Sequence, residues 1–167
     1  MKNENYEIER KFIIEYPDII FLKSIPNVKI IDMVQTYLIP ENIGDVSRIR
    51  KCTVNEKVSY IKTVKRDVSK IKRIEIENEI SKEQYEQELK NKDNSLNQII
   101  KTRYVIENKG KLFEIDIYPF WTDKAVMEVE LNYEDENYYP PKFIKIIKEV
   151  TGDKKFTNYG LAKNNDI

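Results

Sequence analysis

The sequence contains no histidine. This absence excludes serine and cysteine nucleophiles that an imidazole activates, histidine general bases, and zinc sites that need an imidazole ligand. Glycine is also scarce, and the four glycines, Gly44, Gly110, Gly152 and Gly160, lie too far apart for a dinucleotide-binding fingerprint or a P-loop. The remaining candidates for catalysis and ligand binding are carboxylates, lysines, arginines and tyrosines, together with a hard metal ion bound by oxygen atoms.

Other absences concern the compartment and the partners. The single cysteine, Cys52, allows no intramolecular disulfide, the longest apolar run (residues 19–22) is too short to cross a bilayer, and the N-terminal sequence MKNENYEIER lacks the apolar core of a signal peptide. The 29 Lys and Arg balance the 29 Asp and Glu, so no net charge attracts nucleic acid or an anionic membrane. We therefore expect a cytoplasmic protein with no nucleic-acid and no membrane partner.

Length and composition favour one folded domain. The chain has 167 residues, of which 40% are hydrophobic, and it carries 11 Tyr, 6 Phe and 1 Trp. Such a chain has enough apolar surface to bury, and its length matches one domain. No internal repeat, low-complexity stretch or linker divides it, so residues 1–167 are expected to form a single domain.

Apolar residues recur mostly at every second position, which is the period of β-strands. The pattern predicts strands at residues 4–14, 29–39, 46–53, 57–65, 72–80, 98–108, 111–119 and 125–132. Eight strands suffice to close a small barrel. The sequences NEK (55–57) and NKGK (108–111) predict tight antiparallel hairpins, the second with the Asn and Gly that a positive φ favours.

Helices are expected at three places. Ser81 and Gln84 form a capping box that opens a helix in SKEQYEQELKNK. Pro140 and Pro141 are expected to start a second helix that ends at Gly152. The apolar residues of this segment follow helical spacing, at Phe143, Ile144, Ile147 and Val150. A short helical turn is expected near residues 18–24.

Six of the expected strands carry charged residues two positions apart, which a strand points to the same face. The pairs are Glu7 and Glu9, Arg48 and Arg50, Glu75 and Glu77, Lys101 and Arg103, Glu114 and Asp116, and Glu128 and Glu130. For any one strand, the solvated face of an ordinary sheet is the simpler interpretation. The sorting of the pairs by sign argues against it, because surface positions usually mix acids and bases.

If the charged faces instead point into a closed barrel, the buried charges need pairing, hydration or a ligand. Arginine and lysine bind phosphate oxygens, and clustered carboxylates bind Mg²⁺ or Mn²⁺. The pattern therefore favours a hydrated cavity that binds a polyanion together with a metal ion.

The segment EIERKF (7–12) resembles the Glu-x-Glu-x-Lys signature of the CYTH superfamily, the triphosphate tunnel metalloenzymes. Further segments follow in the family's order: QTYL (35–38), RIR (48–50), TVK (63–65), RIEIE (73–77), KTRY (101–104), LFEID (112–116), MEVEL (127–131) and YGLA (159–162). The resemblance covers nearly the whole chain and is strongest to small bacterial inorganic triphosphatases. It implies an α+β fold that is mostly antiparallel β, with an eight-stranded barrel tunnel, a charged lumen and helices packed outside.

The resemblance also implies an enzyme that hydrolyses tripolyphosphate to diphosphate and phosphate with Mg²⁺ or Mn²⁺. It assigns metal binding to Glu7, Glu9, Glu114, Asp116, Glu128 and Glu130. It assigns binding of the triphosphate-bearing small molecule to Lys11, Arg48, Arg50, Lys65, Arg73, Lys101, Arg103 and Lys155. The candidate catalytic residues are Lys101, to orient water or stabilise the leaving group, Tyr37, as a proton acceptor if nearby cations depress its pKa, and Glu9.

Several alternatives stay open. Lys62 competes with Lys65 for the inward position, and Lys154 competes with Lys155 at one tunnel mouth. Other functions in the family are those of a class IV adenylate cyclase and of a thiamine or nucleoside triphosphatase. A module that binds polyphosphate or nucleotides without turnover is the non-enzymatic alternative. The aromatic run at residues 118–121 would stack a base in a cyclase or close the end of a hairpin.

Overall fold

The computed structural model describes residues 5–69 and 71–167, and the expected first residue of the first strand, residue 4, lies outside them. The strands are β1 (Asn5–Glu15), β2 (Lys29–Leu38), β3 (Val46–Val54), β4 (Lys57–Asp67), β5 (Lys72–Ile80), β6 (Ile99–Asn108), β7 (Lys111–Ile117), β8 (Lys124–Leu131) and β9 (Ile146–Glu149). The helices are α1 (Ile19–Ser24), α2 (Lys82–Glu88) and α3 (Asn158–Lys163), with short 3-10 helices η1 (Leu89–Asn91) and η2 (Lys154–Phe156). All eight expected strands are present, with ends shifted by no more than two residues within the described chain.

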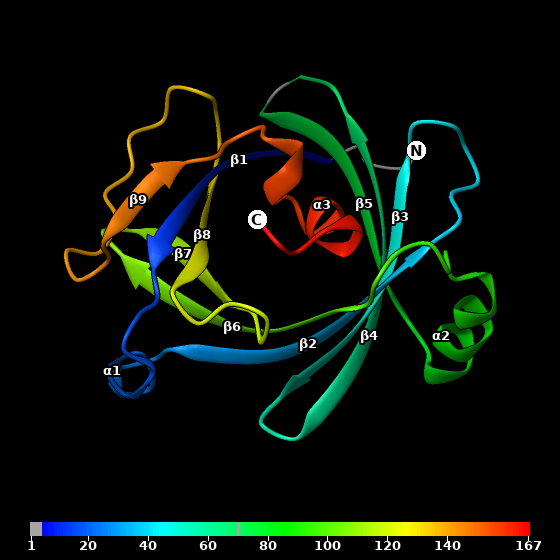
Figure 1. Cartoon of the computed structure of the whole chain (residues 1–167), viewed down its shortest axis with the longest axis horizontal. Coiled ribbons are helices and arrows are strands. Elements are labelled where there is room, and N and C mark those ends of the chain that lie inside the picture. The colour runs from blue at the N-terminus through cyan, green and yellow to red at the C-terminus, as the bar shows by residue number, and fades with distance from the viewer. Residues whose placement is uncertain (1–4, 70) are drawn as a thin grey trace.

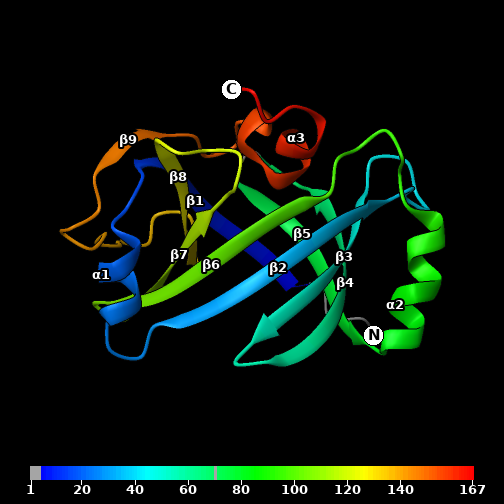
Figure 2. The same cartoon turned by 60° about the horizontal axis from the view of Figure 1, so that its bottom comes forward.

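The strands form a closed antiparallel barrel. Neighbours follow the order β5-β4-β3-β2-β6-β7-β8-β1, and β5 pairs back with β1 to complete the ring of eight among the described residues. Figure 1 shows this ring with α3 near its centre, and Figure 2 shows α3 lying over one end of the barrel. The expected fold, an eight-stranded antiparallel barrel in an α+β chain, is confirmed.

The expected helix between Pro140 and Gly152 is wrong, because part of this segment forms β9. The strand pairs with residues 12–14 of β1, and the Val150 N–H donates to the Lys11 carbonyl at 2.8 Å. Strand β5 pairs with β1 only over residues 5–8, so the backbone groups farther along that edge of β1 need other partners. Pairing with this edge overrides the helical spacing of the local sequence.

Local signals at turns and caps were mostly reliable. The Ser81 hydroxyl accepts from the Gln84 N–H and the Gln84 side chain accepts from the Ser81 N–H, which confirms the capping box of α2. The helical turn near residue 18 is also present, as α1. In the hairpin between β6 and β7 the positive φ values belong to Lys109 (49°) and Gly110 (77°), so the expectation that the Asn adopts one is wrong there.

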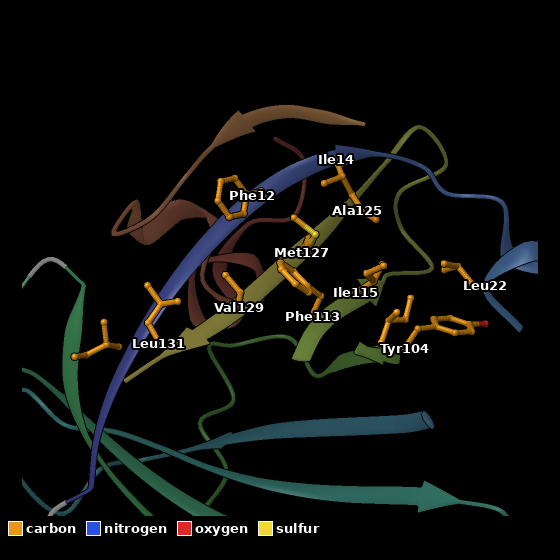
Figure 3. Packing of buried hydrophobic residues seen from close by; sticks show 12 residues of the cluster. Phe12, Ile14, Leu22, Tyr104, Phe113, Ile115, Ala125, Met127, Val129 and Leu131 are labelled. Carbon is orange, nitrogen blue, oxygen red and sulfur yellow. The ribbon is translucent and has the colours of Figure 1, made fainter. Parts of the chain in front are cut away.

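Apolar side chains on the outer surface of β1, β6, β7 and β8 form the largest core cluster. Phe12, Phe113, Met127 and Val129 belong to it, as Figure 3 shows, and Leu22 of α1 packs against them. These residues alternate along their strands with the charged ones. The barrel wall therefore buries its apolar face outside, under α1 and the chain before β9, and turns its charged face inward.

A second apolar cluster fills one end of the barrel. The inward-facing Ile13, Ile99 and Val126 pack there with Leu161 and Ala162 of α3. Helix α2 packs outside the barrel, as expected for the helices, whereas α3 covers this end. Within residues 5–69 and 71–167, every helix is too short or too polar to cross a lipid bilayer.

Candidate functional site

A cavity of about 970 Å³ lies within the barrel. Of the residues assigned to the site from the sequence, its lining contains Glu7, Glu9, Lys11, Tyr37, Arg48, Arg50, Lys65, Arg73, Arg103, Glu114, Glu128, Glu130 and Lys155. The charged faces of the strands therefore converge on a shared interior, and the alternative of a solvated outer face is wrong. Lys101 and Asp116 do not line the cavity, because both are buried in its wall.

Strand register brings the lining charges face to face. In the β1–β8 ladder Lys11 lies opposite Glu128 and Glu9 lies opposite Glu130, and in the β2–β3 ladder Tyr37 lies opposite Arg48. Residues directly opposite each other point to the same face of the sheet. Each strand thus delivers every second side chain to the cavity.

Lys11 and Glu128 form a buried ion pair in the cavity wall. The Lys11 Nζ lies 2.8 Å from Glu128 Oε1 and 3.5 Å from Glu9 Oε1. Burial disfavours the charge on Lys11, but the two carboxylates outweigh it and raise the pKa of the ammonium. Burial likewise opposes ionisation of Glu128, but Lys11 and Arg103 outweigh it and hold its pKa well below the usual range. Both side chains are therefore charged at neutral pH.

Lys65 bridges two carboxylates on neighbouring strands. Its Nζ lies 2.7 Å from Glu7 Oε2 and 2.9 Å from Glu75 Oε2. Burial raises the pKa of Glu7, Lys65 opposes that shift, and Glu75 adds to it. Lys62 instead pairs with Glu88 of α2 at 2.7 Å on the outer side of the barrel, so Lys65 is the lysine of β4 that faces the cavity.

Lys101, Arg103 and Asp116 form a second buried network. The Lys101 Nζ lies 2.5 Å from Asp116 Oδ2, and the Arg103 Nε and Nη2 lie 2.6 and 2.8 Å from the two Asp116 oxygens. Burial and the Arg103 charge lower the pKa of Lys101 to about 8. Asp116 keeps a lowered pKa despite its burial, because Arg103 and Lys101 both favour its charge. The network holds Arg103 against the wall, where the guanidinium also contacts Glu114 and Glu128.

Arg48 differs from the other buried cations of the lining, Lys11, Arg50 and Arg103. Among the described residues no carboxylate forms an ion pair with it, and its buried Nε has no hydrogen-bond partner. Nearby Arg50 keeps a carboxylate partner, Glu77. Burial disfavours its charge, but Tyr37, Glu75 and Glu7 outweigh burial and raise the pKa of Arg48, so the guanidinium stays charged. A buried guanidinium with no carboxylate at ion-pair distance favours binding of an anion from solution.

Tyr37 does not have the depressed pKa that proton acceptance needs. Burial raises the pKa of its hydroxyl, although Arg48 next to it acts in the opposite direction. Its ring also packs edge-on against Tyr159 of the α3 region, with centroids 5.2 Å apart. Tyr37 is therefore a packed side chain of the cavity wall, and its surroundings do not activate it as a base.

The chain after β9 contributes to the cavity more than the sequence indicated. Lys154 and Lys155 both line it, together with Lys163 of α3. The Lys154 Nζ lies 3.5 Å from Asp67, and both side chains are well exposed, so this pair contributes little to stability. Helix α3 was not predicted; the Thr157 hydroxyl, which accepts from the Gly160 N–H at its start, is the local capping signal that could have indicated it. Glu75 and Glu77, which the sequence places on the inward face without a role, line the cavity as well.

The aromatic run at residues 118–121 belongs to the apolar end of the barrel. Tyr118 is fully buried, its hydroxyl donates to Asn158 at 2.7 Å, and its ring packs on Phe120 and Trp121 with centroids 5.1 and 5.4 Å apart. These side chains close an end of the barrel and do not line the cavity, so they are not placed to stack a base there.

Glu130 is a lining carboxylate with several other carboxylates nearby. No lysine or arginine of the described chain forms an ion pair with it, and burial, followed by Glu7, Glu75 and Glu9, raises its pKa. Among residues 5–69 and 71–167, no three carboxylate or thiol side chains are grouped as a metal site. Lysines and arginines form ion pairs with most of the carboxylates that were expected to bind a metal ion, so a divalent cation would have to displace these partners.

Comparisons with known proteins identify relatives by structure. No protein-family model and no curated protein matches the chain. The inorganic triphosphatase NE1496 is 27% identical, with 94% of each chain covered and a TM-score of 0.55. PH1819 from Pyrococcus horikoshii OT3 is 26% identical over 77% of this chain and 80% of its own, with a TM-score of 0.56.

At lower identity the likeness concerns the fold alone. The Bacillus halodurans protein bh2851 is 15% identical over 81% of this chain and 84% of its own, with a TM-score of 0.56. The closed antiparallel barrel is the fold that this chain shares with these neighbours. The expected resemblance to the CYTH superfamily, the triphosphate tunnel metalloenzymes, is therefore confirmed.

Proposed function

We propose that the chain is a metal-dependent triphosphatase that hydrolyses tripolyphosphate to diphosphate and phosphate. The observation that carries the proposal is Arg48, a buried cation to which no carboxylate of the described residues forms an ion pair, in a cavity lined by further cations. The likeness to the inorganic triphosphatase NE1496 over 94% of both chains supports it.

The cations of the cavity bind and orient the substrate. Arg48 and Arg50 from β3 and Arg103 from β6 offer forked N–H groups to phosphate oxygens, and Lys65 and Arg73 approach from β4 and β5. In phosphoryl transfer, positioning and charge neutralisation supply most of the acceleration. No nucleophile from the protein is required.

The carboxylates of β1 and β8 fit a hard divalent cation. Glu7, Glu9 and Glu130 would hold Mg²⁺ or Mn²⁺, because the crowding of acids around Glu130 is relieved by a positive charge. When bound, the metal supplies charge neutralisation on the phosphate oxygens. Asp116 and Glu128 instead hold Arg103 and Lys11 in the directions that phosphate binding needs.

Phosphate release from tripolyphosphate with Mg²⁺ or Mn²⁺ tests the proposal. We expect turnover that EDTA abolishes and that Glu9→Gln strongly reduces. Glu56→Gln, in the β3–β4 hairpin away from the cavity lining, is the matched control and is expected to retain the wild-type rate. A rate that neither EDTA nor Glu9→Gln changes would refute the proposal.

The same assay separates the alternative functions. ATP and thiamine triphosphate are run beside tripolyphosphate, and chromatography distinguishes cyclic AMP from ADP or AMP. Cyclic AMP as the main product identifies a cyclase. Tight binding of tripolyphosphate without turnover in either metal identifies a binding module.

A further inference from the structure

Gln35 occupies an unusual place beside the two arginines of β3. It lies on β2 with its side chain completely buried, opposite Arg50 on one side and Ile99 on the other. Two residues further along β2, Tyr37 lies opposite Arg48. Because Tyr37, Arg48 and Arg50 line the cavity, Gln35 shares their inward face and lies in the wall beneath them.

The amide of Gln35 lacks hydrogen-bond partners. Neither its Oε1 nor its Nε2 has a partner among the described protein groups, and the same holds for the buried Nε atoms of Arg48 and Arg50. An unpaired buried amide destabilises a fold, and an apolar side chain of similar length would fill the same space at lower cost. A residue that breaks this rule next to a site is a candidate for a role in that site.

The two arginines next to Gln35 are the groups on which its amide could act. Arg50 forms an ion pair with Glu77, and Arg48 lies against the Tyr37 hydroxyl. When an anion binds the outer nitrogens of a guanidinium, the Nε must find an acceptor elsewhere. A carboxylate there would neutralise the arginine, whereas the Gln35 amide oxygen accepts the hydrogen bond and leaves the positive charge for the anion.

We propose that Gln35 is a positioning residue whose amide oxygen accepts from the Nε of Arg48 or Arg50 in the anion-bound state and holds that guanidinium toward the phosphates. This inference rests on the proposed triphosphate binding. The inference predicts opposite effects in the two states of the protein. The amide lowers the stability of the free protein and raises its affinity for the anion.

Thermal unfolding of Gln35→Met with and without tripolyphosphate tests the inference. Met matches the length of Gln and has no polar amide, so we expect the melting temperature of the ligand-free protein to stay the same or rise by about 2–4 °C. We expect the affinity for tripolyphosphate, measured by calorimetry, to fall about tenfold. Met33→Leu, a buried apolar substitution on the same face of β2, is the control and should keep the wild-type affinity.

The outcomes distinguish the inference from the proposed function. If the wild-type protein binds no tripolyphosphate, the proposed function fails. If the wild type binds it and Gln35→Met binds equally well, the inference alone is overturned. A fall in both the melting temperature of the free protein and the affinity also overturns it, because the amide is then a structural part of the fold. Gln35→Glu provides a second variant: its carboxylate should pair with the arginines and weaken anion binding at least as much, and unchanged binding overturns the inference.

Discussion

Replacing Asp116 by Asn is expected to destabilise the protein strongly, because this carboxylate holds two buried cations. Asp116 is fully buried and contacts both Lys101 and Arg103 within 2.8 Å. Removing one partner from a buried charge network costs about 3–5 kcal/mol, since the remaining charge is left uncompensated. In a protein of this size that corresponds to a fall in melting temperature of about 6–20 °C.

Lys101→Met is the informative comparison. This change removes a charge that burial already disfavours, as its lowered pKa shows, and it leaves Asp116 paired with Arg103. We therefore expect Lys101→Met to cost about 1 kcal/mol or less, several-fold below Asp116→Asn.

Urea unfolding followed by the fluorescence of the buried Trp121 measures both variants, with an unchanged slope as the check that the unfolding transition is comparable. The reasoning is refuted if Lys101→Met destabilises the protein as much as Asp116→Asn. Activity gives a second readout. Because Lys101 does not line the cavity, Lys101→Met should keep its affinity for tripolyphosphate, and loss of turnover alone, at unchanged stability and affinity, would restore a catalytic role for Lys101.

Three further predictions concern the cavity and the helix that covers its end. Arg48→Gln should abolish the rise in melting temperature that tripolyphosphate produces, with little change in the free protein, and an undiminished rise would contradict the role of Arg48 as an anion-binding cation. Because the pKa of Glu130 is raised on folding, its contribution to stability is present at low pH and is lost as pH rises through the folded-state pKa. Urea titrations of the metal-free protein at several pH values should show that Glu130→Gln loses less unfolding free energy over this pH range than the wild type. An identical pH dependence of the two proteins would exclude this effect. Gly160→Ala should lower the melting temperature by several degrees, because a Cβ there would lie 2.1 Å from the Lys154 carbonyl oxygen, and a variant as stable as the wild type would show that η2 and α3 move apart freely.

Much of the site could be predicted from the sequence because strand geometry is local. Alternation of charged and apolar residues in β1, β3 and β8 gave the inward face of each strand, and the structure places Glu9, Arg48 and Glu128 in the cavity lining as expected. The partner of each charge could not be predicted, since it depends on register between strands distant in sequence. Asp116 illustrates this limit: its parity is right, but two cations hold it in the wall, away from the cavity.

The helix expected after Pro140 failed for a related reason. The spacing of its apolar residues is compatible with a helix, but the open edge of β1 offers backbone partners that only the assembled barrel provides. Likewise, no local pattern shows that α3 folds over the end of the barrel and contributes Lys163 to the cavity.

The sequence by itself determined which eight segments form the strands of the barrel and which side of most of them carries charge, because both follow from a period of two residues along the backbone. Only the tertiary structure decided that β9 extends the sheet, that α3 closes one end, and that, within the described part of the chain, Lys101 forms an ion pair with a carboxylate whereas Arg48 does not. These outcomes depend on distances between atoms that lie far apart in the sequence, and such distances exist only once the ring of strands has closed.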